Sequence, residues 1–127
     1  MANNIKQQPG DVIDWTNGTG SDVASGGVVV IGANGDAVIG VALTAIADTK
    51  TGSVRIAGAV ATVPKVSAAV ITAGEYVMWD SSAGEFDDNQ ASAASGDVSD
   101  AVWAVADAAA STTTVDVLLT GKPGTLA

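Results

Sequence analysis

Histidine and cysteine are both absent from this sequence of 127 residues. Without cysteine the chain has no disulfide framework, no thiolate nucleophile and no zinc–thiolate site. Without histidine it lacks the commonest general base and metal ligand, so acid–base chemistry would need a pair of carboxylates. The sequence therefore predicts no catalytic residues, no metal site and no cofactor.

Basic residues are few and scattered, because five Lys and Arg stand against 14 Asp and Glu and leave a formal net charge of −9. Nucleic acids and anionic membranes are bound by clustered basic side chains, so we expect neither as a partner. Long apolar runs are missing too, since none reaches the roughly 18 residues of a membrane helix. The first residues lack the apolar segment of a secretory signal, so we expect the chain to fold in the cytoplasm in which it is made.

Motifs that carry common chemistries are also missing. The only Gly-Lys pair, Gly121-Lys122, is followed by Pro123, so no phosphate-binding loop is present. No Gly-x-Ser-x-Gly nucleophile elbow occurs. The acidic cluster 85–89 follows Asp80 but does not have the spacing of a calcium-binding EF-hand loop, so we interpret it as a solvated loop.

Glycine, valine, alanine and threonine dominate the sequence, a composition typical of strands and turns. Asn34-Gly35 lies between two apolar runs and predicts a hairpin with a type I′ turn. Alanines in 104–110 leave a short helical turn as an alternative there. We predict an all-β fold, a small antiparallel β-barrel or sandwich, with strands near 12–15, 28–31, 38–41, 54–58, 59–65, 76–79, 101–106 and 114–120.

The first nine residues are polar apart from Ile5 and end at Pro9, which predicts an extended N-terminal arm over 1–9. A single β domain over 10–127 is expected to follow, since the chain has the length of one domain. The alternative for the arm is a disordered terminus.

One internal similarity suggests a duplication. Residues 10–15 read Gly, acid, any, aliphatic, any, Trp, and residues 74–79 repeat this pattern at an offset of 63–64. We therefore predict two pseudo-symmetric β-halves, 10–58 and 74–121, with Trp15 and Trp79 at equivalent strand ends. The alternative is that glycine-bounded strands resemble one another without common origin. Trp103 has no counterpart in this scheme.

Several segments together resemble a family of tailed-phage capsid cement proteins, also called decoration proteins. They span nearly the whole chain in order and include the opening residues 4–17, the strand 25–32, the run 39–42, Gly52-Ser53-Val54, the strand ending in Pro64-Lys65, and residues 74–80. Each piece alone is weakly specific, but the ordered set is fairly specific.

The resemblance implies a small β-protein on the outer capsid surface of the virion, commonly a homotrimer bound to the major capsid protein and made in the host cytoplasm. It implies no catalytic residues. A polar arm suits such a role, because strand addition to a sheet edge supplies backbone hydrogen bonds with little demand on sequence. We expect the capsid-binding arm to consist of Asn3, Asn4, Ile5, Lys6, Gln7, Gln8 and Pro9.

Two alternatives from other classes remain at this point. A carbohydrate-binding or adhesive β-module would present Trp15 or Trp79 on its surface, whereas core or rim packing would bury both side chains. An esterase or glycosidase would need two carboxylates in one cleft, about 5–10 Å apart.

Overall fold

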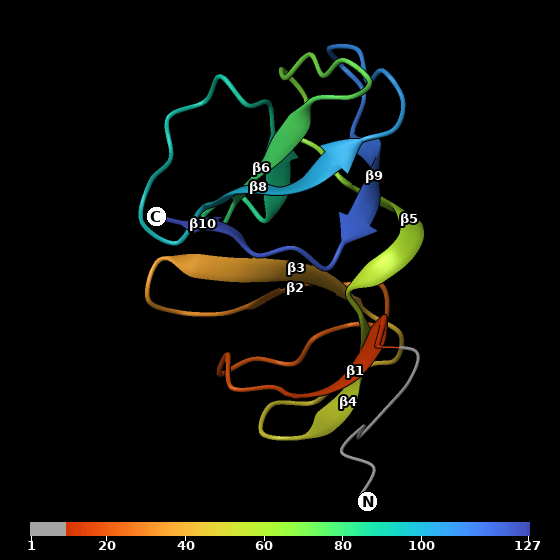
Figure 1. The fold of residues 1–127 in the computed structure, drawn as a ribbon, viewed down its shortest axis with the longest axis vertical. Coiled ribbons are helices and arrows are strands. Elements are labelled where there is room, and N and C mark those ends of the chain that lie inside the picture. Colours follow the sequence, from red (N-terminus) through yellow and green to blue (C-terminus); the bar gives the residue numbers. More distant parts are fainter. Residues whose placement is uncertain (1–9) are drawn as a thin grey trace, which may run out of the picture.

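The structure, a computed structural model, describes residues 10–127, which form ten β-strands and no helix. The predicted all-β class is confirmed. Every pair of strands is antiparallel, and the continuous sheet curls nearly into a barrel (Figure 1). The strands are β1 (Val12–Thr16), β2 (Val28–Ile31), β3 (Asp36–Ala42), β4 (Thr51–Arg55), β5 (Ala57–Pro64), β6 (Tyr76–Asp80), β7 (Glu85–Asp87), β8 (Val98–Ala104), β9 (Thr114–Thr120) and β10 (Gly124–Leu126).

The sheet consists of two four-stranded units with the same order and directions. The first unit runs β1-β4-β3-β2, and the second runs β5-β9-β8-β6. Their registers match at four pairs, although the bulge between Val77 and Trp79 in the β6–β8 pair has no equivalent in the β2–β3 pair. The matching pairs are Val12↔Arg55 with Val60↔Leu118, Thr16↔Thr51 with Pro64↔Thr114, Val28↔Val41 with Tyr76↔Trp103, and Val41↔Arg55 with Trp103↔Leu118.

Hydrogen bonds outside the strands repeat in the same way. Gly26 N donates to Ala42 O at 2.8 Å in the first unit, and Gly74 N donates to Ala104 O at 2.7 Å in the second. Both glycines have a positive φ, +83° and +91°, a conformation that glycine adopts without steric cost. The isolated bridges Val23↔Ile46 and Ile71↔Ala108 also correspond. The two units are therefore copies of one pattern.

The boundaries predicted for the two halves were wrong. The offset of 63–64 makes β1 equivalent to β6, but β1 pairs with β4, whereas β6 pairs with β8 and β7. The pairings instead make β1 equivalent to β5 and β2 equivalent to β6. Trp15 consequently corresponds to Val63, Trp79 to Ile31, and Trp103 to Val41.

The second unit contains an insertion that the first lacks. β2 is joined to β3 by residues 32–35, whereas residues 81–97 separate β6 from β8 and contain β7. β7 pairs with β6, and Phe86 forms a parallel bridge to Lys65 just after β5. The acidic segment is thus not simply a solvated loop, because Phe86 at its centre is fully buried.

The short strand β10 joins the two units at equivalent points. Thr125 pairs with Asp36 of β3 on one side and with Ser99 of β8 on the other. Gly124 approaches β8 so closely that a Cβ atom there would lie 2.1 Å from Ser99 O. In Figure 1 the dark blue chain leading to β10 runs between β3 and β8.

Each unit has its own apolar core, and the two cores differ in size. The second unit supplies most of a large core of fifteen buried residues, which includes Phe86, Val117 and Leu119. The first unit holds a smaller cluster of Val29, Ala42, Ile46 and Val54. The first unit therefore buries far fewer apolar side chains than the second.

Local turn chemistry was predicted correctly where it was clearest. Asn34 and Gly35 have positive φ values, 61° and 90°, as the type I′ turn requires. The helical alternative for 104–110 was wrong, because Ala104 ends β8 and Ala108 bridges Ile71.

Candidate functional site

The predicted arm, Asn3 to Pro9, lies outside the residues that the structure describes. Its attachment point is well defined, because Asp11 makes two contacts with the segment that joins the units. Asp11 O accepts a hydrogen bond from Ile56 N at 2.8 Å. The Asp11 carboxylate also forms an ion pair with Arg55, Oδ2 to Nη1, at 3.1 Å.

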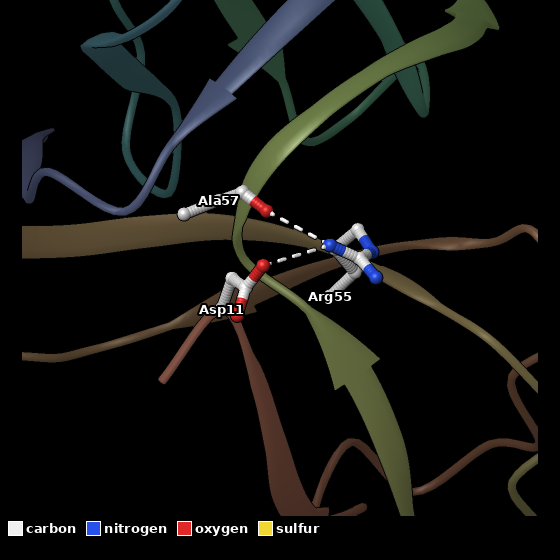
Figure 2. A network of polar contacts seen from close by, with 3 residues as sticks. All are labelled: Asp11, Arg55 and Ala57. Atoms are coloured by element: carbon white, nitrogen blue, oxygen red, sulfur yellow. Dashed lines mark hydrogen bonds and ion pairs between the residues drawn. The ribbon is translucent and has the colours of Figure 1, made fainter. Parts of the chain in front are cut away.

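Figure 2 shows this junction, in which the Arg55 guanidinium faces both Asp11 and Ala57 at the start of β5. Arg55 Nη1 donates to Asp11 Oδ2 and, at 3.4 Å, to Ala57 O. Both charged side chains are about one-third exposed, so their attraction is screened and contributes no more than about 1 kcal/mol. The ion pair holds the base of the arm against the link between the units.

The two tryptophans predicted as core or partner aromatics are both partly buried. Trp15 packs against the small core of the first unit. Trp79 packs against the large core and meets Phe86 edge-on, with ring centroids 4.9 Å apart and an interplanar angle of 61°. Such packing is what the core or rim interpretation predicts, whereas a carbohydrate platform would leave the ring faces open.

Two buried polar side chains close equivalent strand ends. Lys65 is fully buried, and its Nζ donates to the carbonyls of Val66, Ser67 and Ala69 at 2.8, 3.3 and 2.6 Å. Asn17 is also fully buried and takes the corresponding place in the first unit. Sequence reasoning missed both, because lysine and asparagine are mostly exposed and burial depends on carbonyls supplied by the fold.

The acidic loop after β6 is organised by its own hydrogen bonds. Asp80 Oδ1 accepts from Ser82 Oγ at 2.7 Å and from the amides of Ser82 and Ala83, both at 3.1 Å. The Ser82 hydroxyl and then the Ala83 amide lower the pKa of Asp80, because they stabilise the carboxylate form. The carboxylate orders a turn.

Residues 10–127 contain no group of three or more His, Cys, Asp or Glu that could hold a metal ion. Nor does this part of the chain form a helix long and apolar enough to cross a membrane.

Sequence reasoning also missed the outer edge of β2. Within residues 10–127, β2 pairs with β3 alone, whereas its counterpart β6 pairs with β8 on one side and β7 on the other. The Asn34-Gly35 signal identifies a hairpin partner on one side of β2, but no local pattern reveals that the other side is open.

Comparison with known families gave one match, to a family described as phage cement protein, whose model matches residues 7–119. The match covers the base of the predicted arm and both four-stranded units. A search of curated proteins found no match.

Proposed function

Because the chain belongs to the phage cement protein family, we propose that it binds the outer surface of the mature capsid and stabilises the lattice. The observation that carries this proposal is the family match, which spans nearly the whole described β-structure. The proposed partner is the major capsid protein, and the proposed place is the outside of the virion. No catalytic step is part of this function.

The proposed grip is the arm, Asn3, Asn4, Ile5, Lys6, Gln7, Gln8 and Pro9. Its single large apolar residue, Ile5, would anchor it in the capsid, and Lys6 would make a charge contact. Strand addition suits such a segment, because backbone hydrogen bonds need no particular side chain. The Asp11–Arg55 ion pair supports the proposal, since it gives the arm a fixed point of departure.

We further propose a homotrimer. Three arms on one particle would bind with an avidity far above that of a single arm, because each later contact forms at high effective concentration. Weak individual contacts would then suffice for stable decoration. A trimer suits a cement protein that recognises only the mature lattice, since its three arms would require several capsid subunits to present their sites together.

Co-sedimentation with empty capsids tests the function and the arm separately. We expect the full-length protein to co-sediment with expanded capsids and not with unexpanded ones, and to sediment alone as a trimer. Failure to bind expanded capsids would overturn the cement function. Deletion of residues 2–9 and Ile5→Ser should both weaken binding at least about tenfold, because the anchoring contacts are lost.

The matched control is Val60→Ser, which removes a large apolar side chain that is 57% exposed on β5. We expect it to bind like the unmodified protein. Undiminished binding after deletion of the arm would rule out the arm as the grip and leave the capsid-binding function intact.

A further inference from the structure

The second unit is closed by a strand that the first unit lacks. β7 pairs with β6 through Met78↔Asp87, Trp79↔Phe86 and Asp80↔Glu85. At its other side Phe86 O accepts a hydrogen bond from Val66 N at 2.8 Å, just beyond the end of β5. The Phe86 side chain is a member of the large core and is fully buried, with a relative solvent exposure of 0%. β7 therefore seals the gap between the two edge strands of its unit.

The equivalent gap in the first unit lies between β2 and the residues after β1. The counterparts of Met78, Trp79 and Asp80 are Val30, Ile31 and Gly32, and nothing among residues 10–127 pairs with their outer edge. Gly18 is the counterpart of Val66, and a Cβ atom placed on Gly18 would meet no atom within 4 Å. No strand of residues 10–127 takes, in the first unit, the place that β7 takes in the second.

Burial shows the same difference. Met78, Val63, Ile71 and Leu119 are each buried to 4% relative exposure or less, whereas their counterparts Val30, Trp15, Val23 and Ile56 are only partly buried. Trp15, Val23 and Ile56 pack against the small core of the first unit, whereas Val30 packs against the large core. When a large apolar side chain covers the open side of such a cluster, apolar surface is removed from water. This burial lowers the free energy.

We propose that this open edge of the first unit is a docking site for an extended segment of the major capsid protein. The segment adds as a strand beside β2 and inserts one large apolar side chain where the second unit holds Phe86. β7 is the template for this mode, since it achieves the same pairing with three residues. The inference rests on the proposed cement function, because it takes the capsid as the source of the segment.

Charge favours basic residues beside the inserted side chain. β7 carries Glu85 and Asp87 next to Phe86, and the buried Lys65 lies at the adjoining strand end. In the first unit neutral Asn17 replaces Lys65, and Asp22 replaces Val70. The neighbouring Asp48 and Lys50 offset each other. A segment with Lys or Arg beside its apolar residue therefore fits the first unit better than an acidic one.

Residues 10–127 of a second copy of this chain are less suitable donors. The large apolar residues that are exposed within residues 10–127 are Leu43, Val60 and Val70. Val60 is held within the β5–β9 ladder, and Leu43 N donates to Ser53 O. Val70 is followed directly by the Ile71 bridge. None of these residues lies on a strand that is free to leave its own sheet.

The test is amide hydrogen exchange of the full-length protein, free and bound to empty expanded capsids. We expect peptides that cover residues 28–32 to exchange more slowly in the bound state, since new backbone hydrogen bonds protect the β2 edge. Binding without slower exchange in this segment would overturn the docking site and leave the cement function standing. Failure of the protein to bind capsids would overturn both.

Ile31→Lys provides a second measurement, because it places a charge at the gap on a side chain that is already partly exposed. We expect capsid affinity to fall at least about tenfold, with the matched control Val70→Lys unchanged. Equal binding by both variants would overturn the proposal. If Ile31→Lys does not fold, the exchange measurement on the unmodified protein decides. Protection of residues 28–32 in free protein as its concentration rises would identify a second copy as the occupant and also overturn it.

Discussion

Asn17 and Lys65 make the same contact at equivalent places in the two units. Asn17 Nδ2 donates to Ser21 O at 2.8 Å, and Lys65 Nζ donates to Ala69 O at 2.6 Å, in each case four residues along the chain. Their amides also correspond, since Asn17 N donates to Lys50 O and Lys65 N to Thr113 O. Each side chain thus caps the loop after the first strand of its unit by donating to a carbonyl four residues along, although lysine is longer than asparagine.

Replacement of Lys65 by methionine tests the importance of this contact. Methionine keeps most of the volume but leaves three carbonyls without their donor, the buried one of Ala69 among them, so we expect Lys65→Met to lower the free energy of unfolding by about 2–4 kcal/mol. Urea denaturation measures the change. Lys50→Met is the control, because that side chain is exposed, and it should alter stability by less than about 0.5 kcal/mol. Equal stability of the two variants would contradict the capping role.

Side-chain volumes are exchanged between the units at one core position. Gly52 faces Ile46 in the first unit, and the counterparts in the second are Val115 and Ala108. A Cβ atom on Gly52 would lie 2.5 Å from Ile46 Cγ1, so the larger Ile46 occupies the space that Val115 fills in the other unit. The larger side chain is thus Ile46 in the first pair, beside Gly52, and Val115 in the second pair, beside Ala108.

A double substitution should therefore restore part of what each single one loses. We expect Gly52→Val to destabilise the fold by about 1–3 kcal/mol through overpacking, and Ile46→Ala by about 2–5 kcal/mol through a cavity. The double variant reproduces the pair found in the second unit, so its loss should be smaller than the sum of the two, by at least about 1 kcal/mol. A double-mutant cycle from denaturant unfolding measures this coupling. Additive losses would show that the two sites do not share the space.

The sequence predicts those parts of the fold that depend on local chemistry. Asn34 and Gly35 specify their turn because few other residues adopt two successive positive φ values. β7 escaped prediction, because Glu85 and Asp87 are poor strand formers and the strand exists only through its pairing with β6 and the burial of Phe86. Residues 124–126 form β10 for the same reason, since their partners β3 and β8 are distant in sequence.

The two units that the strand pairings show are not the two halves that the offset of 63–64 predicted. The spacing is 48 residues from Val12 to Val60 but 62 from Val41 to Trp103, because the insertion 81–97 has no equivalent in the first unit. No single offset can therefore align the two copies. Residues 10–15 and 74–79 are similar because each segment is a glycine turn followed by a strand. This agrees with the alternative interpretation, in which glycine-bounded strands resemble one another. The open β2 edge follows from the lack of this insertion in the first unit, and it is recognised only when the two units are compared.

The turn after β6 makes a prediction about proton binding. Asp80 has a lowered pKa chiefly because Ser82 Oγ donates to its carboxylate, so Ser82→Ala should raise the pKa toward its ordinary value. Since the folded-state pKa lies below the unfolded-state one, these hydrogen bonds stabilise the fold above the unfolded-state pKa. Their contribution is lost as pH falls through the folded-state pKa. An NMR titration of the Asp80 carboxyl carbon measures the midpoint. Ser92→Ala, in the exposed part of the same loop, should leave it unchanged, and an unchanged midpoint in Ser82→Ala would contradict this account.

Phe86 should be the residue on which closure of the second unit depends. It is fully buried, it packs edge-on against Trp79, and its carbonyl accepts from Val66 N. We expect Phe86→Ala to cost about 3–5 kcal/mol, because a large cavity opens and a strand of three residues cannot hold its pairing without the side chain. The amides of Val66 and residues 85–87 should then exchange faster through local opening. The amides of β3 and β4 should exchange faster only as far as the lower global stability requires.

Phe86→Ala also measures how much the closing strand β7 contributes to the stability of the second unit. With Phe86 removed, the second unit resembles the first, whose gap is open and whose core is partly covered. Val60→Ala, on an exposed side chain, should change stability by less than about 0.5 kcal/mol and serves as the control. A loss below about 1 kcal/mol in Phe86→Ala would mean that the β-unit is stable without its closing strand. In that case the open first unit would need no occupant for its stability, and docking there would serve recognition alone.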